Sequence, residues 1–155
     1  MSVDLKTAEP AEPRSARPPR PDVPPRAHRA DDPVNDAARL VAALVCAGSA
    51  GIHAGLVPAH LRESALLGIM FFFSAIALGV AAVAISDRRR ERHEVVLVAT
   101  VLAATALAYL LSRTTGLPIL VREAEPVDGL GVFTTLFELV GVGACLLLIL
   151  RRTPR

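Results

Sequence analysis

The sequence predicts an all-α protein, a bundle of four transmembrane helices with a disordered N-terminal tail. Hydrophobic residues make up 52% of the 155 residues, and charged residues make up 21%. The hydrophobic residues form four long blocks of about 19–23 residues, enough for a helix to cross a hydrocarbon core of about 30 Å. Strands would leave backbone groups unpaired in lipid, and the short alternating segments of a β-barrel are missing. Each block is therefore expected to be a helix.

Residues 1–35 form the predicted tail, which is rich in proline and arginine. The stretch SARPPRPDVPPRAHRADDP, residues 15–33, mixes prolines with charges of both signs. This composition is typical of a disordered chain with polyproline-II character. The tail has no apolar h-region, so no cleavable signal peptide is expected. We interpret it as a flexible cytoplasmic segment, and its PxxP spacing leaves docking into an aromatic groove as an alternative.

The membrane domain is expected to comprise residues 36–152. Asp36 is placed to begin the first helix, and Pro58 is expected to end it because proline cannot continue helical hydrogen bonding. Arg39 lies one turn inside, where its side chain is expected to reach the headgroups. Ser64 is placed to cap the second helix. The four spans are predicted over residues 37–57, 64–86, 94–112 and 130–150.

Small residues inside the spans are expected to let helices approach closely, either within this chain or between two copies. The residues in question are Gly51 with Gly55 in the first span, and Gly141 with Gly143 in the fourth. Cys46 and Cys145 both lie inside apolar blocks without a CxxC pattern. They are expected to be small buried hydrophobic side chains rather than a redox or metal motif.

The placement of Lys and Arg predicts the orientation of the spans. Fourteen of the 17 Lys and Arg residues lie before and at the start of the first span, between spans two and three, or at the C-terminus. The other three are Arg62, Arg113 and Arg122. By the positive-inside rule, both termini face the cytoplasm, and residues 58–63 and 113–129 face outward. We expect a multi-pass protein of the plasma membrane, and the small net charge of +2 indicates no nucleic-acid partner.

The predicted topology brings a set of ionisable residues to the outer face. This candidate polar site consists of His53, His60, Glu63, Arg113 and Glu138. Glu138 lies about two turns inside the fourth span, and a carboxyl group within a span is costly unless it faces the bundle and has a partner. The candidate partners are His53, at a comparable depth, Arg113, Thr134 and Thr135.

The chemistry of this site stays open at the level of sequence. His53 and His60 are seven residues apart and would share one face of an unbroken helix, although Pro58 argues against such a helix. Together with Glu63 and Glu138 they could ligate zinc, copper or haem. The alternatives are histidines bonded to loop carbonyls, or a proton relay, because imidazole titrates near neutral pH.

The loop SRTTGLPILVREAEPVDGLG, residues 112–131, has a predicted helix exit and a predicted helix start. Gly116 can adopt a positive φ, and Pro118 prevents the helix from continuing. Asp128 is placed to cap the fourth span. No Ser-His-Asp, HExxH, Walker or GxGxxG motif is present, so the sequence does not predict an enzyme.

Three segments carry a resemblance to a known family: HAGLVPAHLRESALLGIMFF, LLSRTTGLP and EAEPVDGLGVFTTLFEL. Over residues 40–150 the chain resembles a family of small four-span membrane proteins from high-GC actinobacteria. The family pattern H-x-x-E-x-x-L-L-G falls on residues 60–68, S-R-T-x-G-L-P on 112–118, and the acidic E-P turn on 125–126. The resemblance implies the four-span fold and the polar outer face, and it implies no substrate.

The sequence therefore favours a small integral membrane protein without enzymatic activity, an accessory or envelope component with a polar site on its outer face. One alternative is a metal- or haem-binding membrane protein that uses His53, His60, Glu63 and Glu138. Another is a small proton-coupled transporter or channel in which Glu138 and His53 form the relay. The expected partners are the lipid bilayer and either another membrane protein or a second copy of the chain.

Overall fold

The structure is a computed structural model that describes residues 32–87, 92–116, 124 and 126–151. These residues form four α-helices, each long and apolar enough to cross a membrane, which confirms the predicted four-span helical fold. The helices are α1 (Pro33–Glu63), α2 (Ala65–Ser86), α3 (Arg92–Thr114) and α4 (Gly129–Arg151). The predicted tail up to residue 31, and Arg122 and Glu125 of the predicted outer loop, lie outside the described residues.

Helix α1 begins earlier and ends later than the sequence predicts. Asp32 is its N-cap and accepts a hydrogen bond from the Val34 amide at 3.1 Å. A proline at the first helical position, here Pro33, needs no hydrogen-bond acceptor. The predicted end at Pro58 is wrong, because the helix continues to Glu63. An interior proline removes a single helical hydrogen bond, and the close packing of α2 along α1 holds the helix together across that gap.

A single residue, Ser64, joins α1 to α2. Its amide donates to the His60 carbonyl at 2.8 Å, and its extended backbone turns the chain into α2. Ser64 occupies the predicted cap position, but its side chain makes no capping hydrogen bond. A Cβ atom added at Gly68 would lie 2.8 Å from the backbone nitrogen of Leu61. Glycine at this position therefore permits the tight return of α2 along α1.

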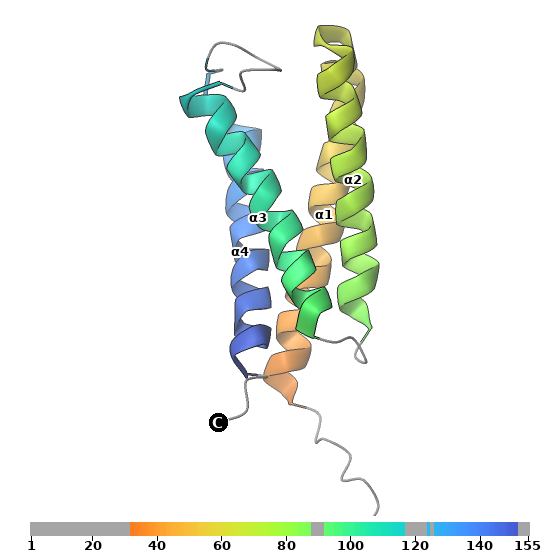
Figure 1. Cartoon of the computed structure of the whole chain (residues 1–155), viewed down its shortest axis with the longest axis vertical. Coiled ribbons are helices and arrows are strands. Elements are labelled where there is room, and N and C mark those ends of the chain that lie inside the picture. Colours follow the sequence, from red (N-terminus) through yellow and green to blue (C-terminus); the bar gives the residue numbers. More distant parts are fainter. Residues whose placement is uncertain (1–31, 88–91, 117–123, 125, 152–155) are drawn as a thin grey trace, which may run out of the picture. The chain divides into compact units, whose positions relative to one another are not determined.

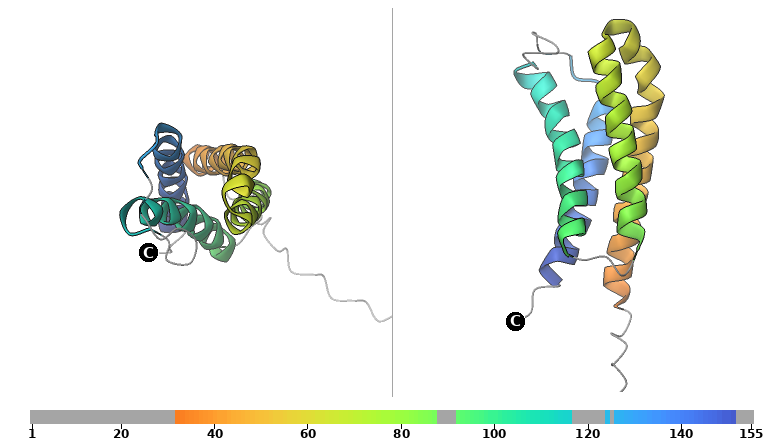
Figure 2. Two further views of the ribbon diagram at one scale, coloured as in Figure 1. Left: turned by 90° about the horizontal axis from the view of Figure 1, so that it is seen from above. Right: turned by 45° about the vertical axis from the view of Figure 1, so that its right-hand side comes forward.

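The four helices run alternately up and down and contact each other in the order α1–α2–α3–α4, with α4 returning to α1 (Figures 1 and 2). We call the end with Ser64 and the start of α4 the hairpin end. The end where α1 starts and α4 finishes is the terminal end. Helices α1 and α2 pack together most extensively, and α2 and α3 least. Figure 1 shows α2 and α3 diverging toward the hairpin end.

The apolar core lies toward the terminal end and consists mainly of small side chains. Both cysteines are fully buried free thiols, in agreement with the sequence prediction. A Cβ atom at Gly141 would lie 2.7 Å from Val45 Cγ1 and 2.8 Å from Leu102 Cδ1, so this glycine brings three helices together. Around Gly51, Gly55 and Gly143 an added Cβ would meet nothing within 4 Å. These three glycines therefore do not make the close contacts within this chain that their spacing suggests.

Two arginines hold the terminal end together. Arg39 is only 7% exposed, and it donates to the carbonyl oxygens of Ile85 at 3.2 Å and Asp87 at 3.1 Å. The expectation that Arg39 reaches the headgroups is therefore wrong, because the carbonyls at the C-terminal end of α2 attract its guanidinium inward. Arg151 forms an ion pair with Asp32 at 3.1 Å, which joins the end of α4 to the start of α1.

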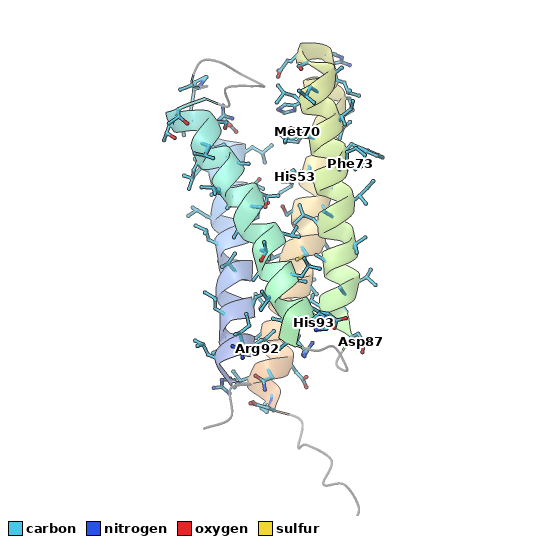
Figure 3. The ribbon with its side chains drawn as sticks, in the orientation of Figure 1. His53, Met70, Phe73, Asp87, Arg92 and His93 are labelled. Atoms are coloured by element: carbon cyan, nitrogen blue, oxygen red, sulfur yellow. The ribbon has the colours of Figure 1, made fainter. Side chains whose placement is uncertain are left out.

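The outward surface of the four helices is strongly apolar. Large side chains such as Phe73, Val83 and Leu150 are 62%, 73% and 71% exposed. Figure 3 shows Phe73 on the side of α2 that points away from the other helices. A surface of this kind, on helices of membrane-spanning length, is suited to contact with lipid chains.

Candidate functional site

A pocket of about 430 Å³ lies in the hairpin-end half of the bundle and is lined by all four helices. Its volume falls within the range of about 300–1,000 Å³ that is typical of small-molecule sites. The lining includes all five residues of the predicted polar site: His53, His60, Glu63, Arg113 and Glu138. The structure thus brings together residues from α1, the end of α3 and α4, while their function stays a prediction.

Glu138 forms the floor of the pocket and is 1% exposed. Its Oε1 atom accepts a hydrogen bond of 2.5 Å from the hydroxyl of Ser49, which is fully buried on α1. The Thr105 hydroxyl of α3 lines the same pocket but donates to the Leu102 carbonyl of its own helix at 2.9 Å. Among the described residues, no ion pair is found for Glu138. The carboxyl group therefore has the Ser49 hydroxyl of α1 as its hydrogen-bond donor among the described residues.

The hydrogen-bond donor to Glu138, Ser49, is none of the four candidates that the sequence offers. Thr134 donates to the Leu130 carbonyl of its own helix at 2.8 Å, and Arg113 forms an ion pair with Asp128. The actual donor, Ser49, lies one helical turn deeper than His53. Glu138 therefore lies deeper in the bundle than His53, whereas the sequence predicted a similar depth for the two residues.

The two histidines lie on one face of α1, because the helix is unbroken between them. His53 Nδ1 lies 3.0 Å from the Ser49 carbonyl, and His60 Nδ1 lies 3.0 Å from the Leu56 carbonyl. A carbonyl oxygen can only accept, so Nδ1 carries a proton in both rings, and Nε2 of each neutral imidazole is an acceptor. The two carbonyls that accept from Nδ1 belong to helix α1 itself, not to a loop.

Phe71 of α2 holds both imidazole rings in place. Its ring stacks on His60 at a centroid distance of 3.8 Å and lies at a tilt against His53 at 5.3 Å. All three residues line the pocket. Figure 3 shows His53 and Met70 in the space between the α1–α2 pair and α3. One wall of the pocket is therefore built from flat rings on a rigid helix hairpin.

Ser49 also connects the imidazole of α1 to the carboxyl group of α4. Its Oγ atom lies 3.4 Å from His53 Nδ1 and donates to Glu138 at 2.5 Å. The order of the three groups is thus imidazole, hydroxyl, carboxyl. In this arrangement, the hydroxyl can pass a proton between a group that lines the pocket and a carboxyl at its floor.

The rim of the pocket is organised by Asp128. Its carboxylate forms an ion pair with Arg113 at 2.8 Å and accepts from the Gly131 amide at 2.7 Å, which confirms Asp128 as the predicted cap of α4. The Arg113 guanidinium lies over the Tyr109 ring, 4.8 Å from its centroid. Gly116 has a φ of 71°, as predicted for the exit of α3. The start of α4 is thus tied to the end of α3.

Ser49, buried behind the pocket floor, and the lining residues Phe71, Thr105 and Tyr109 were not predicted from the sequence. Ser49 lies four residues before His53, and this spacing places both on one helix face, so the signal was present. The contributions of Phe71 and Thr105 depend on how α2 and α3 pack, and no local pattern reveals that.

The described residues contain no group of three or more His, Cys, Asp or Glu side chains arranged to hold a metal ion. Ligation by His53, His60, Glu63 and Glu138 therefore stays a prediction from sequence. Comparisons with protein-family models, curated proteins and solved structures find no match to this chain. Fold and site together define a small multi-pass membrane protein with a polar pocket enclosed by its four helices.

Proposed function

We propose that this chain is a non-enzymatic component of the cell envelope that binds a small amphiphilic molecule in the four-helix pocket. The observation that carries the proposal is the mixed character of the lining. Leu56, Met70 and Phe71 offer apolar surface, while His53 and Glu138 offer polar atoms in the same space. Pockets with apolar walls and a few convergent polar groups are typical of small-molecule sites.

The proposed location is the plasma membrane, with both termini in the cytoplasm and the pocket in the outer half of the bilayer. The excess of Lys and Arg at the terminal end of the spans supports this orientation. Cysteine labelling tests it: a reagent that cannot cross membranes should modify a cysteine placed at exposed Arg62 in intact cells. Labelling only after the cells are opened would reverse the orientation.

Native mass spectrometry of the gently purified protein tests the binding function. We expect a retained small molecule on the wild-type chain, because lipid-phase amphiphiles accompany a membrane protein into mild detergent. Ser74 lines the pocket, so Ser74→Phe should fill it and remove the bound mass. Ala77→Phe is the matched control, because Ala77 is exposed on the same helix and does not line the pocket. Equal occupancy in both variants, or no bound mass in the wild type, would refute the proposal.

A second candidate function is proton-coupled transport, and the chain of His53, Ser49 and Glu138 favours it. A relay of this kind would load and unload a proton at the pocket floor while a solute moves. The test is a proton flux assay in liposomes with the wild type and Glu138→Gln. Loss of flux in the variant supports the relay, and unchanged flux removes Glu138 from it.

A further inference from the structure

We propose that the pocket takes an organic cation with an apolar body from the bilayer, and that this cation replaces a proton at Glu138. This inference rests on the proposed function, because it names the class of the amphiphile that the pocket binds. Three observations support it independently: the balance of charge in the lining, the buried carboxyl group for which the described residues form no ion pair, and the weak contact between α2 and α3.

The charged groups of the pocket favour a positive ligand. Among the described residues, the lining holds three carboxyl groups, Glu63, Asp128 and Glu138, one guanidinium, Arg113, and the imidazoles of His53 and His60. Arg113 is already engaged with Asp128 and lies over the Tyr109 ring. Two carboxyl groups therefore remain for a ligand, one exposed at the rim and one buried at the floor. An anionic ligand would have to approach both of them.

The rest of the lining suits an apolar body attached to that positive group. Leu56, Leu67, Met70 and Phe71 border the space above Glu138. Helices α2 and α3 make the weakest contact of the four neighbouring pairs, and they diverge toward the hairpin end (Figure 1). The pocket is lined from both of these helices. A molecule dissolved in the bilayer can therefore enter between α2 and α3 without first passing through water.

The exchange at Glu138 follows from the cost of an isolated charge. A carboxylate within a membrane span needs a partner, and among the described residues its hydrogen-bond donor is the neutral hydroxyl of Ser49. In the empty pocket the carboxyl group therefore keeps its proton. When the cation arrives, the O–H bond breaks, the electron pair stays on the carboxylate and the proton leaves. One positive charge enters and one departs, so the net charge of the pocket is unchanged.

Several titratable groups lie near Glu138, the proposed proton donor of this exchange. From α1 the titratable neighbours are His53 and the Cys46 thiol. Helix α3 presents the Thr105 hydroxyl beside it, with Tyr109 and Arg113 nearer the rim. The part of α2 that lines the pocket carries no titratable side chain. Of these two titratable groups on α1, His53 lines the pocket and Cys46 does not, so the experiment tests His53 as the competing proton donor.

Tyr109 provides the readout, because it is the only tyrosine of a chain without tryptophan and it lines the pocket. Wild-type protein in phosphatidylcholine liposomes is titrated with octyltrimethylammonium, octanol and octanoate, which share one alkyl chain and differ in charge. Tyrosine fluorescence follows binding, and a pH dye follows the release of protons. We expect saturable binding of octyltrimethylammonium with one proton released, and an affinity that rises about tenfold per pH unit while the carboxyl group is protonated.

Variants separate the contributions of individual groups. Glu138→Gln should weaken octyltrimethylammonium binding by about 30-fold or more and stop proton release, because a desolvated charge pair loses one partner. Glu138→Asp retains the charge and should retain proton release, which keeps the test valid if the glutamine variant misfolds. Glu94→Gln is the control carboxyl group at the terminal end of α3, and it should behave as the wild type.

Three results would overturn the inference in distinguishable ways. Octanol or octanoate binding as tightly as the cation removes the preference for positive charge, while amphiphile binding stands. Proton release that persists in Glu138→Gln but is lost in His53→Gln assigns the exchange to the imidazole. If none of the three probes changes the Tyr109 signal more in the wild type than in Ser74→Phe, the proposed binding function fails as well.

Discussion

The hydrogen bond between Ser49 and Glu138 makes a quantitative prediction about the stability of the bundle. Both side chains are buried, at 0% and 1% exposure, and the bond is 2.5 Å long. Ser49→Ala removes the donor and leaves the carboxyl oxygen with less solvation. An unsatisfied buried polar group costs about 1–3 kcal/mol. We expect Ser49→Ala to destabilise the protein by an amount in this range.

A double-mutant cycle with Glu138→Leu, which removes the acceptor, isolates the interaction between the two side chains. Hydrogen bonds between neutral groups contribute about 0.6 kcal/mol on average inside membrane proteins, and bonds to charged groups in proteins contribute about 1.5–3 kcal/mol. Because the inference above places a proton on Glu138 in the empty pocket, we expect a coupling energy of about 1 kcal/mol. A coupling above about 2 kcal/mol would indicate a carboxylate instead.

The assay is reversible unfolding in mixed micelles of mild detergent and dodecyl sulfate, followed by circular dichroism and by the fluorescence of Tyr109. Ser86→Ala is the matched control, because the Ser86 hydroxyl donates to the Ala82 carbonyl on an exposed face at the terminal end. Its coupling to Glu138→Leu should vanish within the usual error of about 0.3–0.5 kcal/mol. A coupling for Ser49 that is equally small would refute the structural role of this hydrogen bond.

Three further predictions concern the packing and the ends of the helices. Gly141→Ala should be about 1–3 kcal/mol less stable than Gly143→Ala in the same unfolding assay, because a Cβ overpacks the core only at Gly141. Arg39→Ala should lower stability by about 1–3 kcal/mol since two carbonyls lose their donor, whereas exposed Arg62→Ala should stay within about 0.5 kcal/mol. Asp128→Ala should cost about 1–2 kcal/mol through the loss of the helix cap and the ion pair, and Asp128→Asn should recover the part due to the cap.

The four helices could be predicted because lipid leaves few alternatives to a long apolar helix. The details of their ends could not, because they depend on neighbours that are distant in the sequence. Arg39 illustrates this difference. An arginine near the end of an apolar block is expected to contact the headgroups. Arg39 instead binds carbonyls at the end of α2, and one of these belongs to Ile85, 46 residues further along the chain. Pro58 is similar, because the packing of α2 outweighs its local tendency to end a helix.

The site was predictable as a group of residues but not as a network. Topology alone indicated that His53, Glu63 and Glu138 share one half of the bundle, and they line one pocket. The bond that defines the floor connects residues 89 positions apart. A serine within an apolar block gives little local signal of its own, so the partner of Glu138 could be identified only once α1 and α4 were packed together.

The unbroken length of α1 has a consequence for the choice of bilayer. Its 31 residues span about 46 Å, which exceeds a hydrocarbon thickness of about 30 Å. Ser49, which donates to Glu138, lies near the middle of this helix. The length of α1 therefore makes the bundle sensitive to hydrophobic mismatch. In a thicker membrane the bundle would reduce its tilt, and in a thinner one water would come nearer to Glu138 from both faces.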